Sequence, residues 1–220
     1  MIKAVIFDSD GTIVDSEPVS FLSAKKSFQE LYGITITRKD MLPLIGTGIS
    51  NVMQALARKH NHRINLHKIL KQSKKNYLLL VRGRIRIFPG FLSLFRALRR
   101  AGLKTALATS GHKEKLYANM KAVQWNLRNF DVVLHGDMVK RNKPNPEIYI
   151  RARKKLEAKP SECVVIEDSL AGIIAAKRAG ARVIAVTNSF PRKKLKRAGA
   201  DLIVGGFREI TLAAIQRLGR

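Results

Sequence analysis

Residues 2–17 read IKAVIFDSDGTIVDSE, and this stretch sets the expectation for the fold. Its first six residues are apolar apart from Lys3, which is typical of a short buried strand. Asp8 and Asp10 follow at once, and Gly11 allows the chain to bend sharply. Ligands of open α/β sheets bind beyond the carboxyl ends of the strands. We therefore expect a strand over residues 2–7 that delivers Asp8 and Asp10 to such an edge.

The rest of the chain divides into a helical block and an alternating block. From about Asp15 to Arg86 the apolar residues recur at helical spacing without a clear strand. Later strand-like segments alternate with helix-like ones, the last near Glu209–Leu218, and alternation of this kind predicts a Rossmann-like, doubly wound parallel sheet. We expect residues 1–15 and 87–220 to form this core and residues 16–86 to form an inserted, all-helical cap. The later strand-like segments are Lys104–Ala108, Asp131–Leu134, Cys163–Ile166, Arg182–Val186 and Asp201–Val204.

Composition excludes several classes of protein. The chain has 220 residues, of which 45% are hydrophobic, so general disorder is excluded. The single cysteine, Cys163, excludes an intrachain disulfide. Apolar runs such as Tyr77–Val81 are far shorter than the roughly 20 residues that span a bilayer, and the first residues lack the features of a signal peptide. We expect a cytoplasmic protein without a membrane partner, with a monomer as the favoured state.

The net charge is unusually positive. Lys and Arg number 42 and Asp and Glu number 16, which gives a formal charge of +26. This balance attracts anions, yet a generally basic, solvated surface would produce the same number. The sequence contains no Cys/His finger, no basic region leading into heptads and no aromatic cluster of an RNA-binding motif. We expect nucleic acid to bind only nonspecifically through charge, and a basic nucleic-acid-binding protein is the non-enzymatic alternative. The basic run at residues 192–197 is interpreted as a solvated helix face.

Four of the predicted strands are followed by polar clusters. Each cluster alone has an ordinary interpretation as a turn, a loop or a helix cap. Together they would bring carboxylates, hydroxyls and one lysine to one edge of the sheet, which is hard to attribute to coincidence. The clusters are Asp8-Ser9-Asp10-Gly11-Thr12, Thr109-Ser110-Gly111, Lys143-Pro144-Asn145-Pro146 and Glu167-Asp168-Ser169.

These groups suit phosphoryl transfer with a divalent metal. Asp8 and Asp168 offer the hard oxygen ligands that Mg²⁺ prefers, and the metal would screen the repulsion between Asp8 and an anionic phosphate. Asp8 could then attack phosphorus and form an aspartyl phosphate. Asp10 is placed to protonate the leaving oxygen and later to deprotonate water.

The remaining cluster residues are predicted to support this chemistry. Thr109 would bind phosphate where a strand meets a helix, together with Ser9, Gly11 and Ser110. Lys143 would supply a fixed positive charge to the phosphate oxygens and to the nucleophile. Glu167 would hold metal-bound water without binding the metal directly.

These motifs resemble those of the haloacid dehalogenase superfamily over essentially the whole chain. The resemblance implies a Rossmann-like core, a helical cap after the first strand and dependence on Mg²⁺. It also implies Asp8 as the nucleophile, Asp10 as the acid and base, and the backbone carbonyl of Asp10 as a further metal ligand. The dehalogenases themselves lack the second aspartate, so Asp10 argues against dehalogenation. The matching motifs are residues 8–17, Thr109-Ser110, residues 143–149, and Glu167-Asp168-Ser169 with Gly172.

Within the superfamily, the chain is most similar to the group that contains β-phosphoglucomutase and phosphoglycolate phosphatase. The mutases carry a His in the first cap helix and an Arg after a cap glycine, where this chain has Ser20 and Ile49. We therefore expect hydrolysis of a small phosphorylated metabolite, with a phosphosugar mutase as the enzymatic alternative. Residues 44–48 of the cap are expected to face the site. His60, His62 and His67 lack the acid or Cys partners of a metal site.

Overall fold

All six predicted strands lie in one parallel sheet. A computed structural model describes residues 1–41, 44 and 48–219. Within them the strand order is β3-β2-β1-β4-β5-β6, and central β1 aligns Phe7 with Leu107 of β2 and Ile166 of β4. The predicted fold class, a doubly wound parallel sheet with a helical cap, is confirmed. The strands are β1 (Ala4–Phe7), β2 (Lys104–Ala108), β3 (Val132–Leu134), β4 (Cys163–Glu167), β5 (Arg182–Val186) and β6 (Leu202–Val204).

Helices cover both faces of the sheet because successive strand residues point to opposite sides. Phe7 of β1 packs on one face against Phe91 and Phe207, and Ile6 packs on the other face against Ile148 and Ile173. Burial on both faces explains why the strands are almost continuously apolar. The first face is covered by α5 (Phe91–Arg100), α6 (Lys113–Ala122) and α10 (Leu212–Arg217), and the second by α7 (Glu147–Lys155), α8 (Leu170–Arg178) and α9 (Arg192–Arg197).

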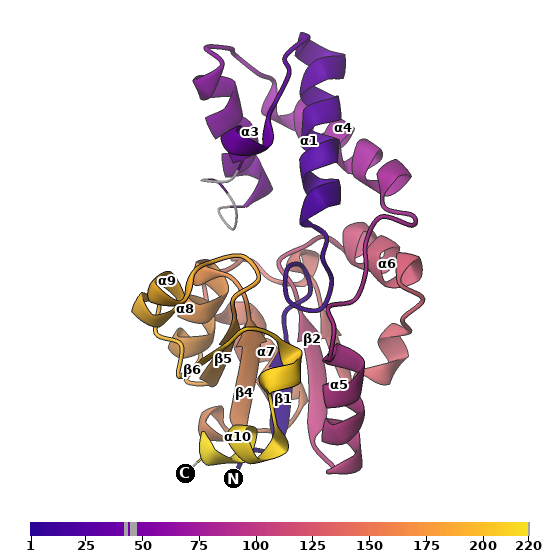
Figure 1. The fold of residues 1–220 in the computed structure, drawn as a ribbon. Coiled ribbons are helices and arrows are strands. Elements are labelled where there is room, and N and C mark those ends of the chain that lie inside the picture. Colours follow the sequence, from indigo (N-terminus) through magenta and orange to yellow (C-terminus); the bar gives the residue numbers. More distant parts are fainter. Residues whose placement is uncertain (42–43, 45–47, 220) are drawn as a thin grey trace.

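The cap consists of helices that share a core of their own. They are α1 (Glu17–Tyr32), α2 (Arg38–Met41), α3 (Ile49–Lys59) and α4 (Leu66–Leu80). Phe28, Met53, Leu56 and Ile69 meet in their shared interior. Figure 1 shows α1, α3 and α4 beyond the carboxyl ends of the strands, so the cap lies over the edge where the polar clusters were expected.

The two chain segments that connect the cap to the core run side by side. The Asp15 backbone N–H donates to the carbonyl of Arg86, and the Phe88 N–H donates to the carbonyl of Ile13. This pairing joins the segment that follows β1 to the segment that leads from the cap back to the core. The division into residues 1–15 and 87–220 as core and 16–86 as cap stays a prediction.

Several predicted boundaries differ from the structure by one to three residues, and one surface prediction is confirmed. Strands β3 and β6 each begin one residue later than predicted, and β4 ends one residue later. The first strand begins at Ala4 rather than Ile2, and the last helix begins at Leu212 rather than near Glu209. The later start follows from Thr211, whose hydroxyl accepts a hydrogen bond from Ala214 N and caps the helix. Residues 192–197 form α9 with only Leu195 buried, as predicted for a solvated helix face. Among the described residues, no helix has the length and apolar character needed to cross a membrane.

Candidate active site

Lys143 connects the polar clusters at the carboxyl edge of the sheet. Its loop lies between β3 and α7, and its Nζ lies 2.6 Å from Asp8 Oδ1 and 2.7 Å from Glu167 Oε1. A third contact, at 3.1 Å, reaches the carbonyl of Ala108 at the end of β2. Each of the three ammonium hydrogens therefore has an acceptor, and the side chain is held between the ends of β1, β2 and β4.

Three carboxylates gather beside this ammonium. One oxygen from each of Asp8, Glu167 and Asp168 lies within 4.8 Å of the others, and all three residues are buried. Asp168 accepts hydrogen bonds from the Thr12 hydroxyl at 2.7 Å and from the Ser189 hydroxyl. The two predicted metal-binding side chains, Asp8 and Asp168, are thus adjacent although they are 160 positions apart in the sequence.

Glu167 is held by hydrogen bonds on both of its oxygens. Oε1 accepts from the Tyr149 hydroxyl at 2.8 Å in addition to Lys143. Oε2 accepts from the backbone N–H groups of Asp168 and Ser169 and from the Ser169 hydroxyl. This arrangement agrees with a supporting carboxylate better than with a direct metal ligand, because its lone pairs already have donors.

The pKa values of this cluster are shifted because it buries three carboxylates beside the ammonium group of Lys143. Burial, followed by the charge of Glu167, raises the pKa of Asp168 to about 7. Burial also raises the pKa of Asp8 well above its usual range, although Lys143 opposes the shift. Burial favours protonated Glu167 too, but Lys143 and the surrounding donors bring its pKa below the ordinary value. Burial alone would lower the pKa of Lys143, whereas Asp8 and Glu167 raise it, so Lys143 stays charged.

The donor set fits a hard divalent cation. Asp8, Glu167 and Asp168 lie together, and the Lys143 ammonium contacts only the first two of these carboxylates, which leaves an excess of negative charge at this point. The ligand atoms that the three acidic residues offer are carboxylate oxygens, and oxygen ligands are those that Mg²⁺ and similar ions prefer. The acidic group can therefore hold a metal ion of this kind.

Asp10 has an environment separate from the three carboxylates. Its Oδ1 accepts from the Ser16 hydroxyl at 2.5 Å, lies 2.9 Å from Lys115 Nζ and accepts from Asn119 Nδ2 at 3.0 Å. Burial would raise the pKa of Asp10, but Lys115 and these hydrogen bonds together lower it. The side chain of Asp10 is thus held as a carboxylate beside the acidic group, two residues from Asp8.

Two glycines permit the close packing of the cluster. Gly11 has φ +78°, and a Cβ at this position would lie 2.2 Å from Asp168 Oδ2. A Cβ on Gly172 would lie 1.7 Å from Glu167 Oε1. Both distances are far below a van der Waals contact, so only glycine fits at either position in this arrangement. The Asp-Gly pair and the distant Gly172 of the sequence motifs therefore have a steric explanation.

The predicted phosphate-binding hydroxyls lie at the same edge. Thr109 is buried at the end of β2, and its Oγ1 accepts from Gly111 N at 3.0 Å. Among the residues that the structure describes, Ser9 Oγ and Ser110 Oγ are buried and have no hydrogen-bond partner. The roles of all these residues stay predictions.

Sequence reasoning missed several supporting residues. Lys115 and Asn119 lie on α6, and Ser189 follows β5, so each reaches its carboxylate only through the fold. Lys115 and Asn119 stand four residues apart and so share one helix face, but nothing in the sequence showed that this face meets Asp10. Tyr77 of α4 also reaches this group through Asn119.

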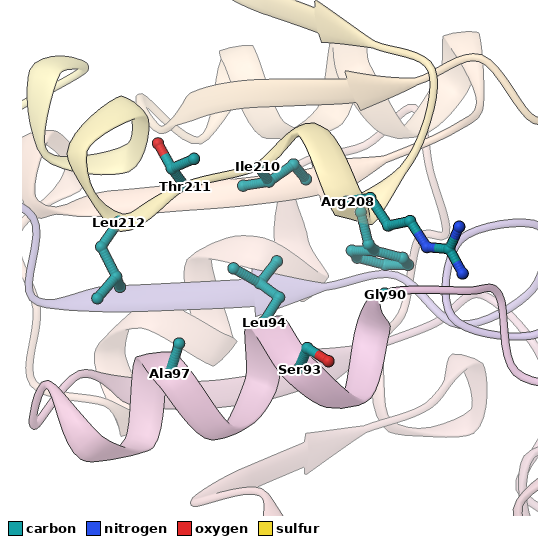
Figure 2. A pocket seen from close by; sticks show the side chains of 9 residues that line it. Gly90, Ser93, Leu94, Ala97, Arg208, Ile210, Thr211 and Leu212 are labelled. Carbon is teal, nitrogen blue, oxygen red and sulfur yellow. The ribbon is translucent and has the colours of Figure 1, made fainter.

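Other predicted or visible features lie outside the acidic cluster. Of residues 44–48, which were expected to face the site, 45–47 lie outside the described residues. Within the described chain, His60, His62 and His67 join no group able to hold a metal. A hollow of about 410 Å³ lies between α5 and the start of α10, and Figure 2 shows the side chains that line it. None of the residues that line this hollow has a carboxylate side chain, so the hollow is distinct from the candidate site. The lining residues are Gly90, Ser93, Leu94, Ala97, Phe207, Arg208, Ile210, Thr211 and Leu212.

Comparison with known proteins identifies the family. The model of the haloacid dehalogenase-like hydrolases matches residues 5–186. A phosphorylated carbohydrates phosphatase of Thermotoga maritima is 32% identical over 208 residues, which is 92% of this chain and 94% of that protein. The crystal structure of CbbY from Rhodobacter sphaeroides in complex with phosphate is similar with a TM-score of 0.83 at 30% identity, and the match covers 98% of this chain and 100% of that one.

One relative is much longer than this chain. The Arabidopsis thaliana protein SUPPRESSOR OF QUENCHING 1, chloroplastic, is 34% identical over 215 residues, but the match spans 92% of this chain and only 19% of that protein. The predicted resemblance and the prediction of an enzyme are confirmed by the match of the family model over most of the sequence. The chain therefore belongs to the haloacid dehalogenase-like hydrolases.

Proposed function

We propose that the protein is a Mg²⁺-dependent phosphatase that hydrolyses a small phosphorylated metabolite through an aspartyl phosphate on Asp8. The observation that carries this proposal is the buried Asp8 carboxylate, 2.6 Å from Lys143 Nζ and grouped with Asp168, with Asp10 two residues along the chain. In this proposal Asp8 is the nucleophile, Lys143 its charged partner and Asp10 the acid–base group.

In the first half of the reaction, a carboxylate oxygen of Asp8 attacks the phosphorus atom. The bond between phosphorus and the leaving oxygen breaks. Asp10 is a carboxylate in the free protein, so it has to take up a proton when the anionic substrate binds, and it then gives this proton to the leaving oxygen. Mg²⁺ held by Asp8, Asp168 and the backbone carbonyl of Asp10 would supply positive charge that offsets the charge of the phosphate. Lys143 keeps the Asp8 side chain in place through its short contact.

In the second half, water replaces Asp8 on phosphorus. Asp10 accepts a proton from the water, the new oxygen–phosphorus bond forms, and the bond from phosphorus to Asp8 breaks. Inorganic phosphate leaves and the Asp8 carboxylate is restored. The hydroxyls of Ser9 and Ser110, buried and unpartnered among the described residues, are suited to donate to phosphate oxygens during both halves.

Hydrolysis is favoured over mutase activity by two residues of the cap. Ser20 stands where the mutases have His, and its hydroxyl donates to the Ser16 carbonyl at 3.1 Å within its own helix. Ile49, at the start of α3, brings no charge where the mutases have Arg. A mutase has to retain a bisphosphate and exclude water, and both replacements weaken that retention. The printed name of the Thermotoga maritima relative supports a phosphorylated carbohydrate as the substrate class to test first.

A screen of several dozen phosphorylated metabolites tests the proposal. Purified protein is assayed for release of inorganic phosphate with Mg²⁺ and after chelation. Release from at least one sugar or acid phosphate, dependent on Mg²⁺, is the expected result. Isomerisation of a sugar 1-phosphate in the presence of its bisphosphate, without net phosphate release, would identify a mutase instead. Absence of both reactions would overturn the proposal.

A further inference from the structure

We propose that Tyr77 of the cap and Asn119 of the core are positioning residues for Asp10, so that docking of the cap sets the direction in which Asp10 presents its free oxygen. This inference rests on the proposed function, because it concerns the residue proposed to protonate the leaving oxygen. It adds two residues, 42 positions apart in the chain, for which the sequence motifs gave no role.

The carboxylate of Asp10 is held at one oxygen and presented at the other. The contacts from Ser16, Lys115 and Asn119 all reach Oδ1. Oδ2 faces the loop after β2, since a Cβ built on Gly111 would lie 3.3 Å from Asp10 Oδ2 and 3.3 Å from Thr109 Oγ1. Asp10 Oδ2 and the predicted phosphate-binding hydroxyl of Thr109 therefore both border Gly111, on the side where a leaving oxygen would need a proton.

Tyr77 fixes which end of the Asn119 amide meets Asp10. The Tyr77 hydroxyl donates to Asn119 Oδ1 at 2.6 Å, and this leaves the Nδ2 hydrogens of Asn119 to donate to Asp10 at 3.0 Å. Both side chains are buried, with exposed fractions of 5% for Tyr77 and 0% for Asn119. Burial, followed by the charge of Asp10, raises the pKa of Tyr77, so its phenol stays a hydrogen-bond donor.

The position of Tyr77 links this chain of contacts to the cap. Tyr77 lies on α4 and packs with Val19, Val81 and Ile85, and this group meets Ala118 of α6. Lys115 Nζ, the cation next to Asp10, lies 5.1 Å from the centre of the Tyr77 ring. Movement of α4 away from α6 would therefore remove two contacts at once. Asn119 would lose the hydrogen bond from the Tyr77 hydroxyl, and Lys115 would lose its contact with the Tyr77 ring.

Removal of the Tyr77 hydroxyl has a defined consequence. Asn119 Oδ1 would lose its partner in a buried place, and the amide would then be held on this side only by its contact with Asp10. The amide could shift, and the direction of Asp10 Oδ2 would be less strictly fixed. Because proton transfer matters most for a leaving group of high pKa, the effect should depend on the substrate.

The test compares kcat/KM for an alkyl phosphate and for p-nitrophenyl phosphate, with Mg²⁺, in wild-type protein and in Tyr77→Phe. The quantity compared is the kcat/KM for the alkyl phosphate divided by the kcat/KM for p-nitrophenyl phosphate. This ratio does not depend on the fraction of protein that is folded, so a folding defect does not imitate the effect. We expect Tyr77→Phe to lower this ratio about tenfold, part of the roughly 10²–10⁴-fold that acid–base catalysis contributes. Asp10→Asn should lower the ratio further still.

Two controls separate positioning from general disturbance of the interface. Tyr117→Phe changes an exposed tyrosine on the same helix as Asn119, and Glu114→Gln breaks the exposed 2.6 Å ion pair with Lys74 between α4 and α6. Both should keep the wild-type ratio. In Asn119→Leu, the further change Tyr77→Phe should have little additional effect, because the tyrosine acts through the amide.

The outcomes distinguish this inference from the proposed function. The alkyl phosphate is chosen from those that the metabolite screen shows to be hydrolysed; if the wild-type protein hydrolyses none, the proposed function fails and this inference fails with it. The positioning role alone is overturned if the wild-type protein is active but Tyr77→Phe leaves the ratio unchanged. It is also overturned if Tyr77→Phe lowers the ratio equally in the wild-type protein and in Asn119→Leu.

Discussion

Lys143 Nζ lies 2.6 Å from Asp8 Oδ1, and the two side chains are only 5% and 10% exposed. The pair joins the loop after β3 to the end of β1, and it places the one ammonium of the acidic group directly on the proposed nucleophile. This contact orients Asp8 and limits the negative charge that an incoming phosphate would meet.

Replacement of Lys143 by Met should lower kcat by about 10²–10³-fold, the range observed when one group that stabilises developing charge is removed. The change also leaves Asp8 and Glu167 buried without their cation, and loss of one partner from a buried pair costs about 3–5 kcal/mol of stability. Rates should therefore be measured on the folded fraction, as judged by circular dichroism. Lys140→Met, at an exposed lysine of the same loop, should keep the wild-type rate. A wild-type rate in Lys143→Met would remove Lys143 from the reaction.

Gly172→Ala should destabilise the protein because its new Cβ would lie 1.7 Å from Glu167 Oε1. Displacement of that buried carboxylate should cost about 1–3 kcal/mol, as overpacking of an interior does. Urea unfolding measures the change. Gly206→Ala is the matched control, since no described atom lies within 4 Å of its new Cβ and the backbone there is extended. Equal stability of the two variants would show that the packing around Glu167 is looser than described.

The charge of Asp168 should give folding stability a pH dependence in metal-free buffer. Burial raises its pKa from the ordinary 3.8 to about 7, so the folded protein keeps a proton that the unfolded chain has released. The contribution of Asp168 to stability is therefore full below about pH 4 and declines until about pH 7, by up to about 1.4 kcal/mol per pH unit. The unfolding free energy of wild type minus that of Asp168→Asn should fall across this window. A constant difference would contradict the raised pKa.

Metal removal should stop turnover, and Mg²⁺ should restore it. Asp168→Asn removes a proposed ligand, so half-maximal activity should need at least roughly tenfold more Mg²⁺. A titration of rate against Mg²⁺ concentration measures this requirement. Glu157→Gln, at a glutamate whose side chain is 80% exposed, should match the wild-type curve. An unchanged requirement in Asp168→Asn would show that Asp168 does not bind the metal.

The fold could be predicted from sequence because its signals are local. Each strand is a short apolar run, and both faces of the sheet are covered, so the runs at Lys104–Ala108 and Arg182–Val186 have the same bounds in the structure as in the prediction. The start of the last helix was missed because Thr211 caps it after a separate turn at Phe207–Glu209. Boundaries of this kind depend on single hydrogen bonds.

The candidate site could be predicted only in part. Asp8, Thr109, Lys143 and Asp168 follow strands in the sequence, so the topology of a parallel sheet was enough to predict that they meet. The supporters of Asp10 come from helices, where Lys115 and Asn119 look like ordinary polar residues. Tyr77 looked like part of an apolar run in the cap, and its contact with Asn119 depends on how the cap packs on the core.

The rate of Asp8→Asn with p-nitrophenyl phosphate and Mg²⁺ tests the central claim most directly. Asn keeps the size of the side chain but cannot serve as a carboxylate nucleophile. The account predicts a fall of roughly 10⁴-fold or more in kcat, comparable with the loss of a nucleophile in other enzymes, in a variant that is still folded by circular dichroism. Turnover by Asp8→Asn near the wild-type rate would contradict it, because phosphorus would then be captured by some other group.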